Sequence, residues 1–158
     1  MRLISVKIYK MNLLLINGPN LNLLGTREKE IYGETTLLEL EENLTQLAKA
    51  EGCNLDCIQT NAEHKIIDAI HNAKLKNNIS AIIINPGAFT HTSIAIRDAL
   101  AGVEIPFYEV HISDINKRED FRKFSYISDI AKKVFTGHGL KGYELALNDA
   151  INKNNLES

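Results

Sequence analysis

Short apolar stretches alternate with longer amphipathic ones along the chain. The apolar stretches end near turn-forming residues such as Asn, Gly and Pro, and they predict strands at residues 13–16, 55–60, 81–84, 105–110 and 134–135. The stretch at 81–84 is one Ala followed by three Ile residues. Such an uninterrupted run is typical of a strand that is covered on both faces.

The segments between these strands carry apolar residues at helical spacing. Thr36 and Glu39 have the spacing of a capping box at the start of one helix, which we expect to end near Gly52. Asn61 is expected to cap the next helix. Further helices are predicted at residues 93–101, near 118–121 and at 142–152, and the polar tail 153–158 is expected to fray.

Strands that alternate with helices predict right-handed βαβ units and a parallel sheet with helices on both faces. The number of units favours an α/β flavodoxin-like fold, a three-layer α/β/α arrangement around a five-stranded parallel sheet, over an eight-stranded barrel. The 158 residues suit a single domain, which we place at residues 11–152. Residues 1–10 are interpreted as an N-terminal extension, and translation could start at Met1 or Met11.

The balance of 18 basic and 20 acidic residues gives a net charge of −2, which disfavours a nucleic-acid partner. No apolar run approaches the roughly 20 residues of a membrane span, and the first residues do not resemble a signal peptide. We therefore expect a cytoplasmic protein with reduced thiols. Cys53 and Cys57 are interpreted as buried or half-buried thiols rather than as a redox pair, which usually shows a C-x-x-C pattern.

The loops that follow the strands are the candidate site, because ligands of open α/β sheets bind at the carboxyl ends of the strands. The loop after the first strand is unusually long for a connection of this kind, which normally takes 2–6 residues. Polar, turn-rich loops follow three strands and should meet at one edge of the sheet, at residues 17–33, 85–93 and 111–114. These loops contain neither a dinucleotide-binding fingerprint nor a P-loop nor a serine-hydrolase elbow.

Acid–base chemistry is the interpretation that remains. Glu109 precedes His111 by two residues, so both side chains should project from the same face of a strand and meet. The alternative is that Glu109 is a solvated residue at the sheet edge. His91 and His111 could bind a metal ion, but neither has a neighbouring metal-binding motif, so we expect no metal.

Arg27 and Tyr32 share the long first loop. A guanidinium held against the phenol would lower the pKa of Tyr32 toward the range that a general base needs. The alternative is an ordinary packed aromatic side chain. Arg118 and Arg122 are four residues apart on a predicted helix and should face the same way, so that with Arg27 they could form a cationic pocket for a small carboxylate. The alternative here is a solvated helix face.

Several ungapped blocks follow one another in a recognisable order: NGPNLNLLG at 17–25 with Arg27 and Tyr32, NPGAFTHTS at 85–93, EVHIS at 109–113, RExFR at 118–122 and GYxLAL at 142–147. Over about residues 11–151 the chain thereby resembles the type II 3-dehydroquinate dehydratases. The family fold is flavodoxin-like. The resemblance implies a lyase that dehydrates 3-dehydroquinate to 3-dehydroshikimate in the shikimate pathway, toward chorismate and the aromatic amino acids, without metal or cofactor.

The resemblance also implies residue roles. Tyr32 would remove a proton from C2 with Arg27 steadying the negative charge, and His111, oriented by Glu109, would protonate the leaving hydroxyl. A water near Asn20 and Asn85 would stabilise the enolate, and Arg118 would support the site or its loop. The substrate-holding residues would be Asn85, His91, Ile112, Ser113 and Arg122. Asp98 would reach into a neighbouring subunit's site, within a trimer that builds a homododecamer.

The chain departs from the family pattern at Asp114, at Lys123-Phe124 and at Phe89, none of which is a proposed proton-transfer group. Two functions of other classes are alternatives. A flavodoxin-like domain that binds FMN or carries a phosphorylated aspartate would need a phosphate-cradling loop or an aspartate cluster after the first strand, and neither is present. A purely structural subunit would show no activity that depends on Tyr32 or His111.

Overall fold

The computed structural model describes residues 8–156, and within them five parallel strands form one sheet. Their order is β2-β1-β3-β4-β5, which is the flavodoxin-like order, so the predicted flavodoxin-like fold is confirmed. The strands are β1 (Met11–Asn17), β2 (Cys53–Gln59), β3 (Ala81–Asn85), β4 (Phe107–His111) and β5 (Lys133–Thr136). Because the order reverses between β1 and β3, a crevice is expected where these two strands end.

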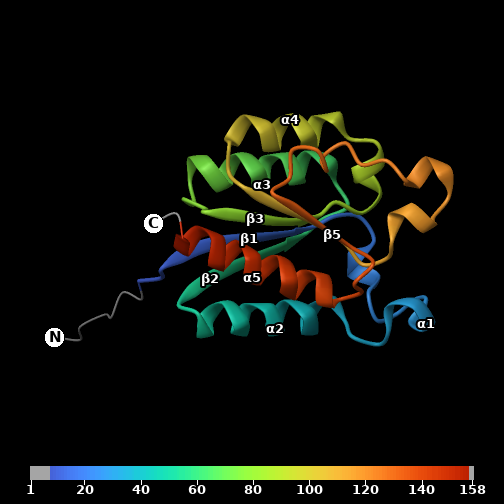
Figure 1. Cartoon of the computed structure of the whole chain (residues 1–158), viewed down its shortest axis with the longest axis horizontal. Helices are drawn as coiled ribbons and strands as arrows, with labels where there is room; N and C mark the ends of the chain where they lie inside the picture. The colour runs from blue at the N-terminus through green and yellow to red at the C-terminus, as the bar shows by residue number, and fades with distance from the viewer. Residues whose placement is uncertain (1–7, 157–158) are drawn as a thin grey trace.

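Helices cover both faces of the sheet (Figure 1). On one face lie α2 (Leu37–Ala50) and α5 (Lys141–Leu156), and on the other lie α3 (Glu63–Leu75) and α4 (Ile94–Val103). The loops at the carboxyl edge contain only short helical turns, which are η1 (Leu21–Leu23), α1 (Lys29–Tyr32), η2 (Gly87–His91), η3 (Ile115–Lys117) and η4 (Asp120–Arg122). The three predicted layers are confirmed.

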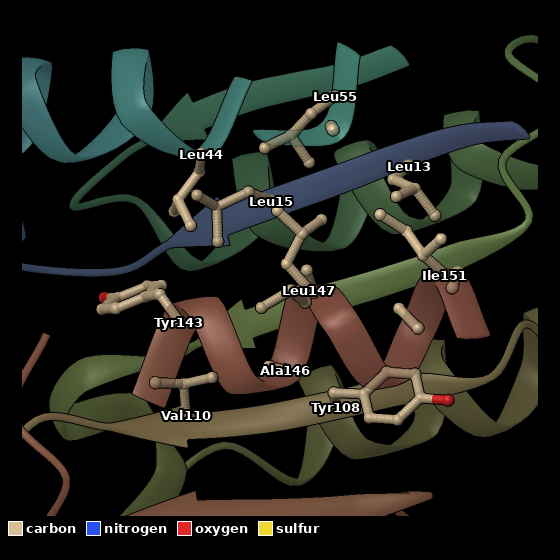
Figure 2. Packing of buried hydrophobic residues seen from close by; sticks show 14 of the residues in the cluster. Leu13, Leu15, Leu44, Leu55, Tyr108, Val110, Tyr143, Ala146, Leu147 and Ile151 are labelled. Carbon is tan, nitrogen blue, oxygen red and sulfur yellow. The ribbon is translucent and has the colours of Figure 1, made fainter. Parts of the chain in front are cut away.

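Each face of the sheet has its own hydrophobic core, because successive strand side chains point to opposite faces. Leu13 and Leu15 pack under α2 and α5 (Figure 2), and Ile83 belongs to the same cluster. Ile82 and Ile84 pack under α3 and α4. All of β3 is buried, as its uninterrupted apolar sequence predicts. Each such side chain contributes about 1.5–3 kcal/mol of hydrophobic stabilisation, so the strand ends rest on a rigid base.

One predicted helix start is confirmed, and another is wrong. Thr36 and Glu39 form the predicted capping box. Asn61 does not cap α3, so that prediction is wrong: Ala62 is the N-cap residue, and the Ala62 N–H donates to the Thr60 hydroxyl. The Asn61 Oδ1 atom instead accepts the backbone N–H of Asn20, in the long loop after β1. A tertiary hydrogen bond has replaced the local one.

Two further boundaries differ from the prediction. The expected helix near residues 118–121 is replaced by the separate turns η3 and η4, because Arg118 adopts an extended backbone conformation between them. Helix α5 continues to Leu156, four residues beyond the predicted end at 152. Residues 1–7 of the expected extension and residues 157–158 of the expected tail lie outside the described residues. Lys10, the residue before β1, donates its N–H to the Gly52 carbonyl.

The two cysteines lie on β2, Cys53 buried and Cys57 half-buried, as predicted. Burial raises the pKa of the Cys53 thiol, and burial together with the nearby Glu41 raises the pKa of Cys57 to about 12. Both groups are therefore protonated thiols at neutral pH. Among residues 8–156, no helix has the length and apolar character to span a membrane.

Candidate active site

The carboxyl ends of β1 and β3 lie side by side, where Asn17 pairs with Asn85. The Gly18 N–H donates to the Asn85 carbonyl at 2.8 Å, which ties the loop after β1 to the loop after β3. A Cβ atom at Gly18 would lie 2.3 Å from the Pro86 carbonyl oxygen. Only glycine allows the two loops to approach this closely.

Residues of these two loops help to line a cavity of about 340 Å³. It collects side chains from three separate loops, as the strand-end argument predicts, and the predicted site residues that line it are Asn20, Arg27, Tyr32, Asn85, His91, His111, Ile112, Ser113 and Arg122. Two predicted residues do not line it. Glu109 is fully buried behind His111, and Asp98 is exposed on α4. Arg118, predicted in a supporting role, lines the cavity as well.

Glu109 and His111 form the hydrogen-bonded pair that their spacing predicts, through Glu109 Oε2 and His111 Nε2. The Glu109 side chain has no solvent exposure, which excludes the alternative of a solvated edge residue. The Ser128 hydroxyl donates to the second carboxylate oxygen at 2.8 Å. Both oxygens of a buried carboxylate are thus partnered, and the imidazole is held in one orientation with a fixed tautomer.

The guanidinium group that contacts Tyr32 in this structure belongs to Arg118. Its Nη1 atom lies 3.4 Å from the Tyr32 hydroxyl oxygen and donates to Ser113 Oγ at 3.0 Å. The Tyr32 ring packs against the core under α2 and α5 while its hydroxyl reaches the cavity, so the packed and the catalytic interpretations are compatible. Arg27, for which that contact was expected, lines the same cavity.

The predicted cationic pocket is present although the predicted helix is not. Arg118 and Arg122 are half-buried and line the cavity with Arg27, which excludes a solvated helix face. The Arg122 Nε and Arg118 Nε atoms lie 3.2 and 3.7 Å from the Glu119 carboxylate. A backbone hydrogen bond and these two guanidinium groups lower the pKa of Glu119. Glu119 therefore stays ionised and forms an ion pair with each of the two arginines.

His91 has its ring fixed from outside the cavity. Its Nδ1 atom lies 2.8 Å from the Phe124 carbonyl oxygen, which can only accept, so Nδ1 carries the proton. The Nε2 atom of the neutral ring is then an acceptor. Among the residues that the structure describes, no three His, Cys, Asp or Glu side chains form a group that could hold a metal ion.

Tyr143 is a buried polar residue near the site that the sequence patterns did not single out. Its hydroxyl accepts from Asn85 Nδ2 at 2.8 Å and donates to Asn17 Oδ1 at 2.7 Å. Burial raises the pKa of Tyr143 far above its ordinary value, so the hydroxyl keeps its proton. The GYxLAL block contains this residue, but its link to Asn17 spans 126 positions and no local pattern shows it.

Comparison with known proteins gives a consistent result. The sequence model of the family described as Dehydroquinase class II matches residues 11–151. The 3-dehydroquinate dehydratase of Polynucleobacter asymbioticus is 58% identical over 142 residues, which are 90% of this chain and 95% of that protein. The 3-dehydroquinate dehydratase of Buchnera aphidicola subsp. Acyrthosiphon pisum (strain Tuc7) is 60% identical over 143 residues, which are 90% of this chain and 94% of that protein.

Solved structures agree with the sequence relatives. The type II dehydroquinase from Butyrivibrio crossotus has a TM-score of 0.85 at 46% identity, with 89% of this chain and 97% of that chain covered. The enzyme from Propionibacterium acnes has a TM-score of 0.85 at 40% identity, with 91% and 98% covered. The match extends over nearly the whole length of both proteins in every case. This chain belongs to the class II dehydroquinase family, whose members are hydro-lyases.

Proposed function

We propose that the cavity at the carboxyl edge of the sheet dehydrates 3-dehydroquinate to 3-dehydroshikimate in the shikimate pathway, through an enolate. One observation carries the proposal: the phenol of Tyr32 and the imidazole of His111 line a single cavity together with three arginines. These groups supply a base, an acid and a site for a carboxylate. Two relatives that are 58% and 60% identical are named 3-dehydroquinate dehydratase, which supports the same reaction.

Tyr32 is the base in this proposal. A proton on the carbon next to a ketone is weakly acidic, so the base must be a phenolate rather than a neutral phenol. A guanidinium within hydrogen-bonding distance stabilises the charge of a phenolate. Arg118 occupies that position, and Arg27 adds a second positive charge to the same cavity. Tyr32 takes the C2 proton, and the C–H electron pair moves into the enolate.

Asn20 and Asn85 are assigned to the developing enolate charge. Both line the cavity, one from each of the two loops that Gly18 joins. Asn20 has a left-handed backbone with φ of 70°, and its N–H is held by Asn61. Donors that are fixed before the reaction stabilise developing charge without reorganisation. A water held between these residues would hydrogen-bond the enolate oxygen.

His111 is the acid. Hydroxide is a poor leaving group, so the C1 hydroxyl needs a proton as its bond to carbon breaks. The imidazolium donates that proton and the hydroxyl departs as water, while the enolate electron pair forms the new double bond. Glu109 and Ser128 hold the ring during this transfer, since Glu109 bonds Nε2 and Ser128 bonds Glu109.

The remaining cavity residues hold the substrate. Arg122 is suited to the substrate carboxylate, because a guanidinium binds a carboxylate through two parallel hydrogen bonds. Four further cavity residues would contact the ring hydroxyls, in part through backbone groups: His91, Ile112, Ser113 and Asn85. This set accounts for a small anionic substrate and requires neither a metal nor a cofactor for the two proton transfers.

We also propose that the domain at residues 11–152 assembles in the cytoplasm as a dodecamer built from trimers, with Asp98 reaching a neighbour's site. Asp98 is exposed on α4 and lies outside the cavity of its own chain, and Ile94 on the same helix is 56% exposed. Mass photometry should give about 212 kDa, which is twelve copies of 17.7 kDa. A fully active monomer would contradict the role of Asp98.

A direct assay tests the function. Purified protein is mixed with 3-dehydroquinate, and the enone absorbance of the product is followed without added cofactor. We expect turnover that EDTA does not change. Absence of turnover by folded protein would refute the proposed reaction, and a metal requirement would refute the mechanism.

A further inference from the structure

The Tyr143 hydroxyl joins the two asparagines that end β1 and β3. It lies 2.7 Å from Asn17 Oδ1 and 2.8 Å from Asn85 Nδ2, and all three side chains are buried. In Figure 2 the hydroxyl of Tyr143 points toward the carboxyl ends of the strands, whereas Tyr108 lies toward their opposite ends. Asn85 lines the cavity, but Asn17 and Tyr143 do not. The hydroxyl therefore lies directly behind the site.

Hydrogen-bond directions in this group are fully determined. The Gly87 N–H donates to Asn85 Oδ1 at 3.1 Å, so the amide oxygen faces the turn after β3 and the amide nitrogen faces Tyr143. The single hydroxyl proton of Tyr143 goes to Asn17 Oδ1, because the Asn85 NH2 group can only donate. A reversed amide would place an NH2 group against the Gly87 N–H. Asn85 therefore has one favourable orientation.

We propose that Tyr143 is a positioning residue for the dehydration, which fixes the Asn85 amide so that its second N–H serves the cavity as a donor. The inference rests on the proposed function of this cavity and assigns Tyr143 a role through Asn85 alone. Tyr143 is fully buried and does not line the cavity, so it does not contact the substrate. A donor aimed at developing charge accelerates the reaction only if its direction is set in advance.

The test compares wild type with Tyr143→Phe by steady-state kinetics. We expect kcat to fall about tenfold with KM changed less than twofold, because the lost alignment affects the transition state more than substrate binding. This is smaller than the 10²–10³-fold loss of deleting such a donor outright. Tyr108→Phe is the matched control, since it removes another buried tyrosine hydroxyl from the same core. It should keep the wild-type kcat.

A double-mutant cycle separates positioning from general stability. In an Asn85→Ala background, Tyr143→Phe should leave kcat unchanged, because the group it positions is gone. An equal fall in both backgrounds, or an equal fall in Tyr108→Phe, would refute the proposal. So would a folded Tyr143→Phe enzyme with normal kcat.

Asn17→Leu provides a second variant if Tyr143→Phe does not fold. It removes the Oδ1 atom that accepts the Tyr143 hydroxyl proton. The Asn17 Nδ2 atom has no partner among the described protein atoms, so the substitution breaks no protein hydrogen bond at that nitrogen. The hydroxyl can then turn away from Asn85, and we expect kcat to fall several-fold. A normal kcat in Asn17→Leu would count against the proposal. Absence of wild-type turnover would instead refute the proposed function itself.

Discussion

The Nη1 atom of Arg118 lies 3.4 Å from the hydroxyl oxygen of Tyr32, although 86 residues separate them in the chain. Ser113 accepts a second hydrogen bond from the same nitrogen, which keeps the guanidinium beside the phenol. The residue that contacts the proposed base thus comes from the loop after β4, while the base comes from the loop after β1. The contact connects two of the loops that enclose the cavity.

Substitution of Tyr32 and its guanidinium neighbours tests this relationship. Tyr32→Phe should lower kcat at least ~100-fold, the range for loss of a general base. Arg118→Ala and Arg27→Ala should each remove most of the turnover, because the phenolate loses a stabilising charge. Lys117→Ala, at an exposed neighbouring position, is the control and should keep the wild-type turnover. Circular dichroism should show an intact fold in all four variants; near-normal turnover in Tyr32→Phe would exclude it as the base.

His111→Ala separates the two proton transfers. Loss of water from the substrate should slow strongly, while exchange of the C2 proton with deuterated solvent should slow much less, because Tyr32 is still present. NMR follows the exchange, and absorbance follows the loss of water. An equal fall in both rates would show that His111 is needed for enolate formation, contrary to the proposed division of roles.

Ser128 is expected to act on the acid through Glu109. Ser128→Ala removes one of the two partners of a carboxylate that has no solvent exposure, so His111 is held less firmly. We expect kcat to fall about tenfold. Ser125→Ala is the matched control, since the Ser125 hydroxyl bonds Thr90 at 2.6 Å instead of Glu109. A fall of the same size in both variants would point to loop stability rather than to orientation of His111.

Gly18→Ala should destabilise the protein, because the new Cβ would lie 2.3 Å from a backbone oxygen of the neighbouring loop. Overpacking of this kind costs about 1–3 kcal/mol, measurable by urea denaturation. Gly102→Ala is the opposite case. Gly102 lies within α4, and a Cβ atom there would meet no atom within 4 Å apart from its own helix backbone. The free energy of unfolding should therefore rise by about 0.5–1 kcal/mol. Equal stability of the two variants would contradict the close approach of the loops.

The cysteines should resist alkylation in the native protein. At pH 9 an ordinary thiol with a pKa of 9.0 is half thiolate, but Cys57, with a pKa of about 12, is ionised to about one part in a thousand. Because burial raises both pKa values, iodoacetamide should label Cys53 and Cys57 slowly until guanidinium unfolds the chain. Mass spectrometry counts the modified residues. Fast native labelling at both positions would show that β2 opens readily.

Local patterns were sufficient for the sheet and for part of the site. The i, i+2 spacing of Glu109 and His111 predicts their contact, because strand geometry alone brings the two side chains together. The loops after β1, β3 and β4 meet at one edge because parallel strands share a direction. These features follow from the regular geometry of strands, which a short segment of sequence already determines.

The features that were missed depend on partners distant in sequence. Asn61 has the residue type of a helix cap, but its amide oxygen binds the Asn20 N–H, 41 residues away. Arg118 and Arg122 have helical spacing, yet their backbone forms separate turns while both side chains reach the cavity. Tyr143 was missed because its partner Asn17 lies 126 positions away in the sequence. Competition between a local and a tertiary hydrogen bond cannot be judged from spacing alone.

The position of α5 in the chain has a consequence for biosynthesis. This helix is translated after all five strands, and it supplies Tyr143, Leu147 and Ile151 to the core beneath β1, β3 and β4. A nascent chain that has not yet released these residues leaves one face of its sheet uncovered and the asparagines at the strand ends unsupported. Folding of this sheet on the ribosome can therefore finish, and catalysis begin, only after α5 has emerged from the exit tunnel.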